Sequence, residues 1–492
     1  MRLSAPAIAV VATPNMAELT ATQKDALDAV GKGHSIVLAG AAGTGKSFLI
    51  RKIAKDFPWV EVTATTGIAA VGVGGITLSR FAGLKTADPG REGAAKLKEL
   101  RAAAPGDVPR LEEEFLALAS AELIKVVRMF KTNVSRLRSA RAIVIEECSM
   151  MSRYQFEGFD LVCQRIRRRP GVPFGGLQLI CVGDMRQLPP VSPDSDDDIM
   201  SQFFFTSQLF DKTFKMVFHL TEVFRQSDPV FRDMLCRVGS GSLTPADIAL
   251  LQSRVKDEQC PDAVRLYGTN RSVQLYNNRK LDSIDSEPHS YKMKSVVVNE
   301  DGGSRGQIDS LCRWAADQCI AEKELVLKKG SFVMFLCNRT EELCNGTLGY
   351  VVGFNGDTPL FVPQDEYDPD VDYEEADRSK RMRADNGHVY TSTGALEVVP
   401  HMWEVTEHTV ATIGLMQIPL KLAWAITVHK SQGAQFDKVV ASIDQRNCFG
   451  PGAAYVALSR CTNLEGLELT SFDPACVVAA PEANAFYDNY CP

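Results

Sequence analysis

Residues 40–47 read Gly-Ala-Ala-Gly-Thr-Gly-Lys-Ser, which matches the phosphate-binding pattern G-x-x-x-x-G-K-S. In such a loop the glycines let backbone N–H groups turn toward phosphate oxygens, and the helix that follows adds the positive end of its dipole. Lys46 is placed to reach the β- and γ-phosphates, and the Ser47 hydroxyl to bind Mg²⁺. We expect the whole loop to bind a nucleoside triphosphate: Gly40, Ala41, Ala42, Gly43, Thr44, Gly45, Lys46 and Ser47.

Two further segments carry side chains that can act on a bound triphosphate. An apolar run over 142–145 ends in Glu146 and Glu147. At the carboxyl end of a strand, the first carboxylate can hold Mg²⁺ and the second can orient and deprotonate the attacking water. A second apolar run leads into Gly183–Pro190, a polar turn that can place Gln187 against the γ-phosphate. The Pro-Pro pair in this turn, taken alone, is more often a loop stop.

The segments around these residues predict a doubly wound α/β fold, because short apolar β-rich runs alternate with helix-prone stretches. One expected set of strands is 35–39, 60–64, 142–145, 177–182 and 216–220, and a second set is 264–266, 332–336, 439–443 and 467–469. Residues 85–140 interrupt the first set with charged, helix-prone stretches at 91–104 and 111–137. Residues 346–412 interrupt the second set and are rich in glycine, proline and acidic residues, which indicates a small all-β insertion with an acidic loop.

A chain of 492 residues is too long for one core and suggests two to four domains. We expect a flexible leader over 1–17, for which a weak targeting signal is the alternative. A first domain is expected over 18–260, a second over 261–345 and 413–492, and the β insertion over 346–412.

Composition limits the cell compartment and the class of partner. The thirteen cysteines are scattered without a C-x-x-C pair, so we expect free thiols in an intracellular, reducing compartment and no secretion. No apolar stretch is long enough to cross a bilayer, so no membrane partner is expected. The net charge of −7 is concentrated in acidic runs at 194–198 and 365–377, so it neither excludes nor establishes nucleic-acid binding.

An ordered series of motifs gives the chain a family resemblance. The segments are Leu19–Gln23, the phosphate loop, Thr66–Ala70, Gly74–Leu78, Ile145–Met150, Pro173–Leu179, Gly183–Pro190, Glu222–Gln226, Asn345–Gly349, Trp424–Gly433 and Tyr455–Arg460. The series resembles the petite integration frequency (PIF-type) DNA helicases of superfamily 1, relatives of the RecD-like helicases. The resemblance covers roughly residues 17–490 and implies two RecA-like P-loop domains. It also implies a wedge-like insertion in the first domain and a small β-barrel insertion in the second.

The resemblance implies roles for individual residues. Gln23 resembles an adenine-reading glutamine, and Gln187 a γ-phosphate sensor. Arg225 and Arg460 resemble two arginine fingers, one from each side of a nucleotide cleft between the domains, because guanidinium is always charged and fits phosphate oxygens. Gly433 is implied as a further nucleotide contact. ATP and Mg²⁺ are the implied ligands. A GTPase is disfavoured, because the sequence contains no N-K-x-D motif, which reads guanine.

The resemblance also implies contacts to single-stranded DNA, through hydroxyls and amides that hold phosphates and an aromatic ring that can stack on a base. For Phe81 and His429 taken singly, a place in the core is the commoner reading. The run 165–169 carries four arginines, for which a solvated helix end and a DNA contact both stay open. The implied contacts are Thr66, Gly67, Thr77 and Phe81 in the first domain, and Thr427, His429, Lys430, Ser431 and Gln432 in the second.

Three positions depart from the family pattern. Glu146 stands where Asp is usual, Met185-Arg186 replaces an aromatic pair, and Ser79-Arg80 replaces His-Ser. The leading hypothesis is an ATP-dependent helicase, a monomer that moves 5′ to 3′ on single-stranded DNA and acts at single/double-strand junctions with replication, recombination or repair proteins. The alternatives are a DNA-stimulated translocase that remodels protein–DNA complexes without unwinding, and a nucleotide-gated DNA-binding scaffold.

Overall fold

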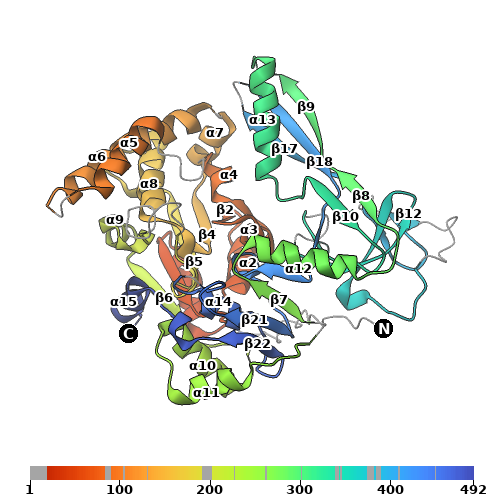
Figure 1. The fold of residues 1–492 in the computed structure, drawn as a ribbon. Helices are drawn as coiled ribbons and strands as arrows, with labels where there is room; N and C mark the ends of the chain where they lie inside the picture. The colour runs from red at the N-terminus through yellow and green to blue at the C-terminus, as the bar shows by residue number, and fades with distance from the viewer. Residues whose placement is uncertain are drawn as a thin grey trace. The chain divides into compact units, whose positions relative to one another are not determined.

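The chain forms two compact units (Figure 1) in a computed structural model. The P-loop unit comprises residues 19–257 and 442–491, and the second unit comprises Glu258–Ala441. The described residues are 19–83, 90–103, 106–129, 131–190, 202–226, 228–260, 263–300, 302–337, 343, 346–373, 382–383, 389–407, 410–448 and 450–491. The expected leader, the acidic cluster at 194–198 and residues 374–377 of the acidic run lie outside them. Across the described residues, no helix combines the length and apolarity that crossing a membrane requires.

The P-loop unit is built on a parallel sheet in the order β3-β2-β4-β5-β1-β6. Ala64 pairs with Glu146, Glu146 pairs with Val182, and Ala39 pairs with Gly183, so these strands end level with one another. The carboxyl ends of β1, β4 and β5 therefore share one edge of the sheet. The strands are β1 (Ile36–Gly40), β2 (Val60–Ala64), β3 (Ile76–Thr77), β4 (Ala142–Glu146), β5 (Gln178–Gly183) and β6 (Met216–Leu220).

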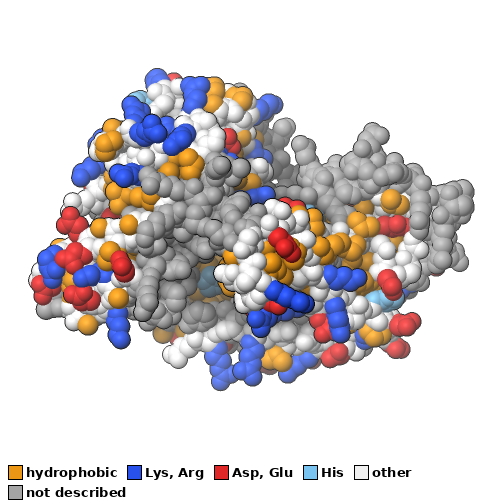
Figure 2. All heavy atoms as spheres, turned by 90° about the horizontal axis from the view of Figure 1, so that it is seen from above, with side chains coloured by type: hydrophobic (Ala, Val, Ile, Leu, Met, Phe, Trp, Pro, Cys, Tyr) orange, Lys and Arg blue, Asp and Glu red, His pale blue; other side chains and the backbone are white. Residues whose placement is uncertain are grey.

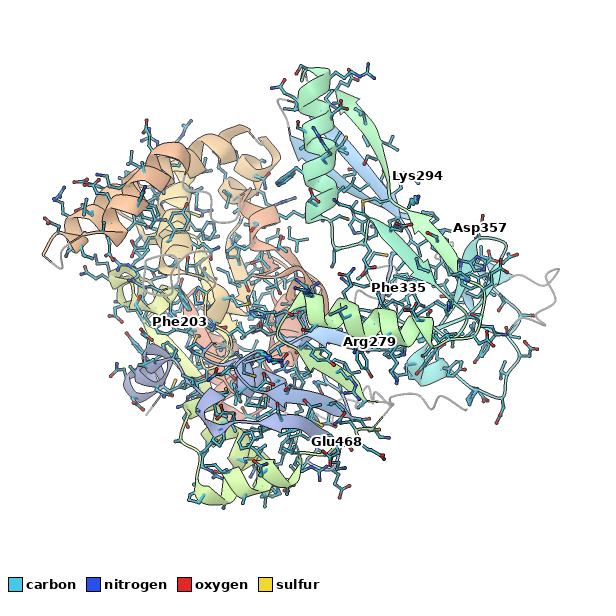
Figure 3. The ribbon with its side chains drawn as sticks, in the orientation of Figure 1. Phe203, Arg279, Lys294, Phe335, Asp357 and Glu468 are labelled. Carbon is cyan, nitrogen blue, oxygen red and sulfur yellow. The ribbon has the colours of Figure 1, made fainter. Side chains whose placement is uncertain are left out.

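Both faces of this sheet are buried, as expected for a parallel sheet. Along β1, Val37 and Ala39 pack into one core while Ile36 and Leu38 pack into the other, because successive side chains point to opposite faces. Helices α1 (Ala21–Gly31) and α2 (Lys46–Asp56) contribute to the second core. Phe203, labelled in Figure 3, belongs to the first core. The helices on that first face are α4 (Leu78–Ala82), α5 (Gly90–Arg101), α6 (Val108–Met129), α7 (Lys131–Ser139), α8 (Arg153–Arg167), α9 (Gln208–Thr213) and α15 (Pro481–Tyr490).

Among the remaining elements of the P-loop unit, α10 packs against α14 of the C-terminal segment. Gly239 of α10 leaves room for the Tyr455 ring, since a β-carbon there would lie 3.4 Å from it. The element α14 therefore packs closely on α10. These elements are α3 (Gly67–Gly72), α10 (Pro229–Ser240), α11 (Pro245–Ser253), α14 (Ala453–Ser459) and β22 (Leu467–Phe472).

The second unit combines a short parallel sheet with antiparallel sheets. In the parallel part, β7 (Val264–Tyr267) lies between β20 (Ala425–Thr427) and β21 (Val439–Ile443), and α12 (Asn270–Asp282) packs against β7 and β20. A seven-stranded antiparallel sheet has the order β14-β15-β16-β13-β12-β11-β19 and surrounds a core that includes Phe335, labelled in Figure 3. Its strands are β11 (Phe332–Phe335), β12 (Leu348–Asn355), β13 (Thr358–Pro363), β14 (Met382–Arg383), β15 (Val389–Tyr390), β16 (Leu396–Glu397) and β19 (Leu420–Leu422).

A separate three-stranded sheet has the order β17-β18-β9, with α13 (Arg305–Gln318) packed on β18. Its strands are β9 (Lys294–Glu300), β17 (His401–Glu407) and β18 (Ala411–Gln417). Two more strands, β8 (His289–Lys292) and β10 (Glu324–Leu327), pair with each other.

The α/β fold class predicted from the sequence is confirmed, with two differences in detail. Residues 332–336 were expected in a second α/β sheet, but β11 pairs antiparallel with β12 and β19. The expected insertion at 346–412 is divided between two sheets, because β17 pairs with β18 and β18 pairs with β9, outside the seven-stranded sheet. Contacts group residues 442–491 with the P-loop unit. The domain boundaries given above stay a prediction.

Phe81, expected from the resemblance to stack on DNA bases, is fully buried in the first core of the P-loop unit. The guanidinium of Arg136 lies over its ring at 5.8 Å, and the Asn133 amide donates to the Phe81 carbonyl at 2.9 Å. The ring therefore presents no free face to a base in this structure, and the commoner reading of an isolated phenylalanine as a core residue applies.

We expect Phe81→Ala to lower the free energy of unfolding by about 3–5 kcal/mol, because it leaves a cavity in a closely packed core. Chemical denaturation measures this change. Trp314→Ala is the control, since Trp314 is 53% exposed, and it should change stability by no more than about 0.5 kcal/mol. A Phe81→Ala protein with unchanged stability and weakened binding of single-stranded DNA would restore the stacking role.

Candidate active site

The predicted phosphate loop joins β1 to α2 with the geometry that its glycines require. Gly43 and Gly45 have φ values of 84° and 81°, in the left-handed region that favours glycine. A β-carbon at Gly43 would also lie 2.4 Å from the β-carbon of Arg225. The Phe224 N–H donates to the Gly43 carbonyl at 2.8 Å. Glycine at position 43 thus brings the segment that carries Arg225 directly against the loop.

Side chains of the loop are held by its own carbonyls. The Lys46 ammonium donates to the carbonyls of Gly40 and Ala41 at 2.8 and 2.9 Å, and the Thr44 hydroxyl donates to Ala41 at 2.9 Å. An incoming phosphate would offer Lys46 a charged acceptor in place of these neutral ones, and such charge-assisted bonds are stronger.

Glu146 ends β4 beside the first turn of α2. Its Oε1 accepts from the Ser47 hydroxyl at 3.4 Å, whereas its Oε2 is buried and has no hydrogen-bond partner among the described residues. Burial, together with the charge of Glu147, raises the pKa of Glu146 to about 8. A buried carboxylate and a hydroxyl this close are the hard oxygen ligands that Mg²⁺ takes, so the residues fit the predicted metal.

Glu147 occupies a strained backbone position immediately after the strand. Its φ of 54° lies in the left-handed region, which is costly for a residue with a β-carbon. Thr65 stabilises this turn, because its N–H donates to the Glu146 carbonyl at 3.0 Å and its hydroxyl donates to the Glu147 carbonyl at 2.9 Å. The strain turns the chain at the carboxyl end of β4, where a catalytic carboxylate would act.

Asp184, which follows β5, is the centre of a buried network. It accepts hydrogen bonds from the hydroxyls of Tyr455 and Tyr487 at 2.8 and 3.0 Å, and from the amide of Gln187 at 3.3 Å. The Tyr455 hydroxyl in turn accepts the N–H of Ala42 in the phosphate loop at 3.2 Å. Burial, reinforced by the Asp184 charge, raises the pKa of Tyr455 well above its usual range, so the hydroxyl remains protonated. The network links the predicted γ-phosphate sensor to the phosphate loop.

Arg225 and Arg460 both lie in the P-loop unit, where Arg460 is buried and Arg225 is half-buried. Ser459 contacts both: its carbonyl accepts from Arg225 at 3.4 Å, and its hydroxyl accepts from Arg460 at 2.9 Å. Burial, followed by repulsion from Arg460, lowers the pKa of Arg225 to about 9. Two guanidinium groups that repel each other, one buried and one half-buried, favour the binding of an anion between or beside them.

Gln23 lies in the first turn of α1, where it is 1% exposed. Its Oε1 accepts the Thr20 N–H at 3.0 Å in a capping box. Its Nε2 is buried and has no hydrogen-bond partner among the described residues. Of the two ends of the amide, the NH₂ group is therefore the one left to pair with a base, since the oxygen is used in the helix cap.

Three of the predicted DNA contacts of the P-loop unit follow β2 and β3 at the same carboxyl edge of the sheet. The Thr66 hydroxyl accepts the Ala69 N–H and the Thr77 hydroxyl accepts the Arg80 N–H, each at 3.2 Å. Both threonines thus begin short helices. Gly67 is exposed, with open space where a β-carbon would lie.

The predicted contacts of the second unit surround a single helical turn after β20. The Thr427 hydroxyl accepts the Lys430 N–H at 3.3 Å, and the buried Ser431 hydroxyl donates to the Val428 carbonyl at 2.7 Å. Burial and the neighbouring charge of Lys421 lower the pKa of Lys430 to about 8. The turn comprises His429, Lys430 and Ser431; Thr427 ends β20 before it, and Gln432 follows it, then Gly433 at a φ of 84°.

The P-loop unit therefore contains all six residues of the predicted catalytic set, and sequence reasoning missed the residues that support them. Asp184, Tyr455 and Tyr487 were not singled out as site residues. Asp184 and Tyr455 lie inside motifs that the sequence did identify, but nothing in a linear motif shows that the two side chains meet. Tyr487 lies in α15, outside those motifs. The distribution of surface charge does not point to these residues either. Basic and acidic groups form several separate patches on the face drawn in Figure 2.

Comparisons with known proteins agree with this geometry. A profile of the PIF1-like helicase family matches residues 18–99 and 116–247, and a profile of the DNA helicase Pif1 2B domain matches 316–354. The chain is 32% identical to the ATP-dependent DNA helicase PIF1 of Xenopus laevis, over 96% of this chain and 65% of that protein. It is also 32% identical to the human protein of the same name, over 96% of this chain and 63% of that protein. The chain thus spans less than two thirds of these relatives' length.

Solved structures give the same family. The crystal structure of the Pif1 helicase from Candida albicans aligns with a TM-score of 0.74 and 28% identity, covering 96% of this chain and 99% of that chain. A structure described as showing DNA unwinding at forked duplex DNA by two coordinating Pif1 helicases aligns with a TM-score of 0.65 and 26% identity, covering 96% and 97% of the two chains. The fold, the phosphate loop with its two carboxylates and both family profiles agree, and the chain belongs to the PIF1-like helicase family.

Proposed function

We propose that this chain is an ATP-dependent DNA helicase that uses ATP and Mg²⁺ to move along single-stranded DNA. One observation carries the proposal: the phosphate loop, two buried carboxylates and the two arginines lie in one unit, together with a sensor glutamine in the Asp184 network. That set of groups is suited to phosphoryl transfer, where catalysis depends on positioning and charge stabilisation.

We assign each residue of the proposed site a role in phosphoryl transfer. Lys46 exchanges its loop carbonyls for phosphate oxygens, and Gln187 orients the attacking water near the γ-phosphate. Glu147 accepts a proton from that water. Arg225 and Arg460 stabilise the charge that builds up on the transferred phosphoryl group.

Ser47 and Glu146 are the residues that would hold Mg²⁺, which when bound neutralises charge on the phosphate oxygens. The extra methylene of Glu146, relative to the family's usual Asp, is accommodated in this structure because its Oε1 already reaches the Ser47 hydroxyl at 3.4 Å. The carboxylate at this position therefore retains the reach that a metal ligand needs.

Relatives support DNA as the track. Proteins 32% identical to this chain are named ATP-dependent DNA helicase PIF1. We propose single-strand contacts through Thr66, Gly67 and Thr77 in the P-loop unit. In the second unit we propose Thr427, His429, Lys430, Ser431 and Gln432, with movement 5′ to 3′. The lowered pKa of Lys430 supports this assignment, since a DNA phosphate would favour its charged form.

We expect Lys46→Ala and Glu147→Gln each to reduce ATP turnover by about 10²–10⁴-fold, because each removes one group acting on the transferred phosphoryl or its nucleophile. Steady-state hydrolysis measures the loss. Glu147→Gln should still bind ATP, since its backbone turn and its size are kept, whereas Lys46→Ala should bind ATP more weakly. Wild-type protein without DNA-stimulated hydrolysis would instead support the scaffold alternative.

We expect Tyr455→Phe to lower kcat by about 5–150-fold, because loss of one buried hydroxyl leaves Ala42 and Asp184 short of a hydrogen bond at a cost of about 1–3 kcal/mol. Tyr490→Phe is the matched control: it removes a 2.8 Å tyrosine–aspartate bond to Asp211, away from the phosphate loop. The readout is the kcat of each variant divided by the kcat of the wild type. Equal values for the two variants would show that the network has only a structural role.

The helicase proposal is tested by strand separation on duplexes with a 5′ or a 3′ single-stranded tail, in the presence of ATP and Mg²⁺. We expect unwinding of the 5′-tailed duplex only, and none with Lys46→Ala. Hydrolysis that is stimulated by single strands, but accompanied by unwinding of neither duplex, would favour the translocase alternative.

A further inference from the structure

A hollow lies between α7 and the C-terminal end of α8, with a volume of about 580 Å³. Its polar lining consists of Ser135, Arg138, Ser139, Arg165 and Arg168, and its apolar lining consists of Val134 and Ile166. Among the described residues, none that lines it is acidic.

Two of the three arginines of this hollow do not hold the fold together through their side chains. The Arg165 and Arg168 guanidinium groups have neither an ion pair nor a hydrogen bond within the described part of the chain, and the Arg138 guanidinium donates only to the Ile166 carbonyl, at 3.2 Å. Arg167 behaves differently, since it donates to the carbonyls of Gly175, Leu137 and Ala140. Arg167 therefore ties α7 to α8, while its neighbours leave their guanidinium groups available.

The hollow is remote from the nucleotide site. The phosphate loop and Glu146 lie at the carboxyl ends of the strands, whereas α8 runs back to end beside Ala140, which precedes the first residue of β4. The five residues of β4 separate the two edges by about 17 Å at 3.3 Å per residue. An anion bound in the hollow would not be part of the bound ATP.

Helix dipoles explain some basic residues at this place, because both helices end here and attract cations. They do not explain why three guanidinium groups and two hydroxyls line one concave surface without a carboxylate. Guanidinium forks and hydroxyls are the groups that hold phosphodiester oxygens without reading bases, while Val134 and Ile166 offer no base-specific contact.

We propose that this hollow, the α7–α8 pocket, binds phosphate groups of a nucleic-acid backbone as a second DNA contact, at the edge of the sheet opposite the phosphate loop. The inference rests on the proposed function, in that DNA is the ligand. It adds a site that lies outside the motifs assigned to single-strand contact.

The test compares Arg165→Ala/Arg168→Ala with the charge-matched control Lys55→Ala/Lys212→Ala, which removes two exposed cations elsewhere on the P-loop unit. Equilibrium binding of a single-stranded oligonucleotide is measured over a series of salt concentrations. We expect the slope of log K against log[salt] to become shallower by about 1.4 in the pocket variant, because each lost phosphate contact contributes about 0.7. The control should keep the wild-type slope, and both variants should keep wild-type ATP hydrolysis without DNA.

Two further titrations identify the source of the anion, with inorganic phosphate and with a polyglutamate peptide as probes. Equal salt slopes for the pocket variant and wild type would overturn the proposal, and loss of phosphate or polyglutamate binding in that case would assign the pocket to a free anion or an acidic protein. If the wild type binds DNA and hydrolyses ATP, and the pocket variant has the same salt slope as the wild type, only the pocket proposal is overturned. Wild type that binds no DNA would overturn the proposed function as well.

Discussion

Asp184 is a buried carboxylate on which the geometry of the active site depends. It is 1% exposed and accepts hydrogen bonds from Tyr455, Tyr487 and Gln187. These donors come from α14, α15 and the turn after β5, and Tyr455 extends the network to the phosphate loop. A buried charge is tolerable only when its hydrogen bonds are made, so the segments that supply these donors are held in one arrangement.

The site itself is built from groups that are unfavourable without a ligand. Glu146 and Glu147 are adjacent buried carboxylates, and the buried Arg460 repels the half-buried Arg225. Glu147 adds a strained backbone at φ 54°. Such violations of local stability concentrate at functional sites, where a bound ligand compensates for them. A triphosphate with its metal would supply charge of the needed sign to both groups.

The strands of the P-loop unit were predictable because their residues repeat a simple physical pattern. Buried parallel strands must be apolar on both faces, and the runs over 35–39 and 142–145 agree within one residue at each end with β1 and β4, in which every residue is buried. The pairing of strands was less accessible. The run over 332–336 has the composition of a buried strand in either kind of sheet, so its antiparallel pairing in β11 depends on distant residues in β12 and β19.

The sequence by itself determined the chemistry of the phosphate loop, since G-x-x-x-x-G-K-S requires only local backbone geometry and a helix start. It also determined the family, because that rests on an ordered set of short motifs. Tertiary structure decided which side chains reach the site. It buried Phe81 in the core, used the Gln23 carbonyl for a helix cap and brought Tyr455 to the phosphate loop. Those outcomes depend on contacts between residues far apart in the chain, and no local pattern encodes them.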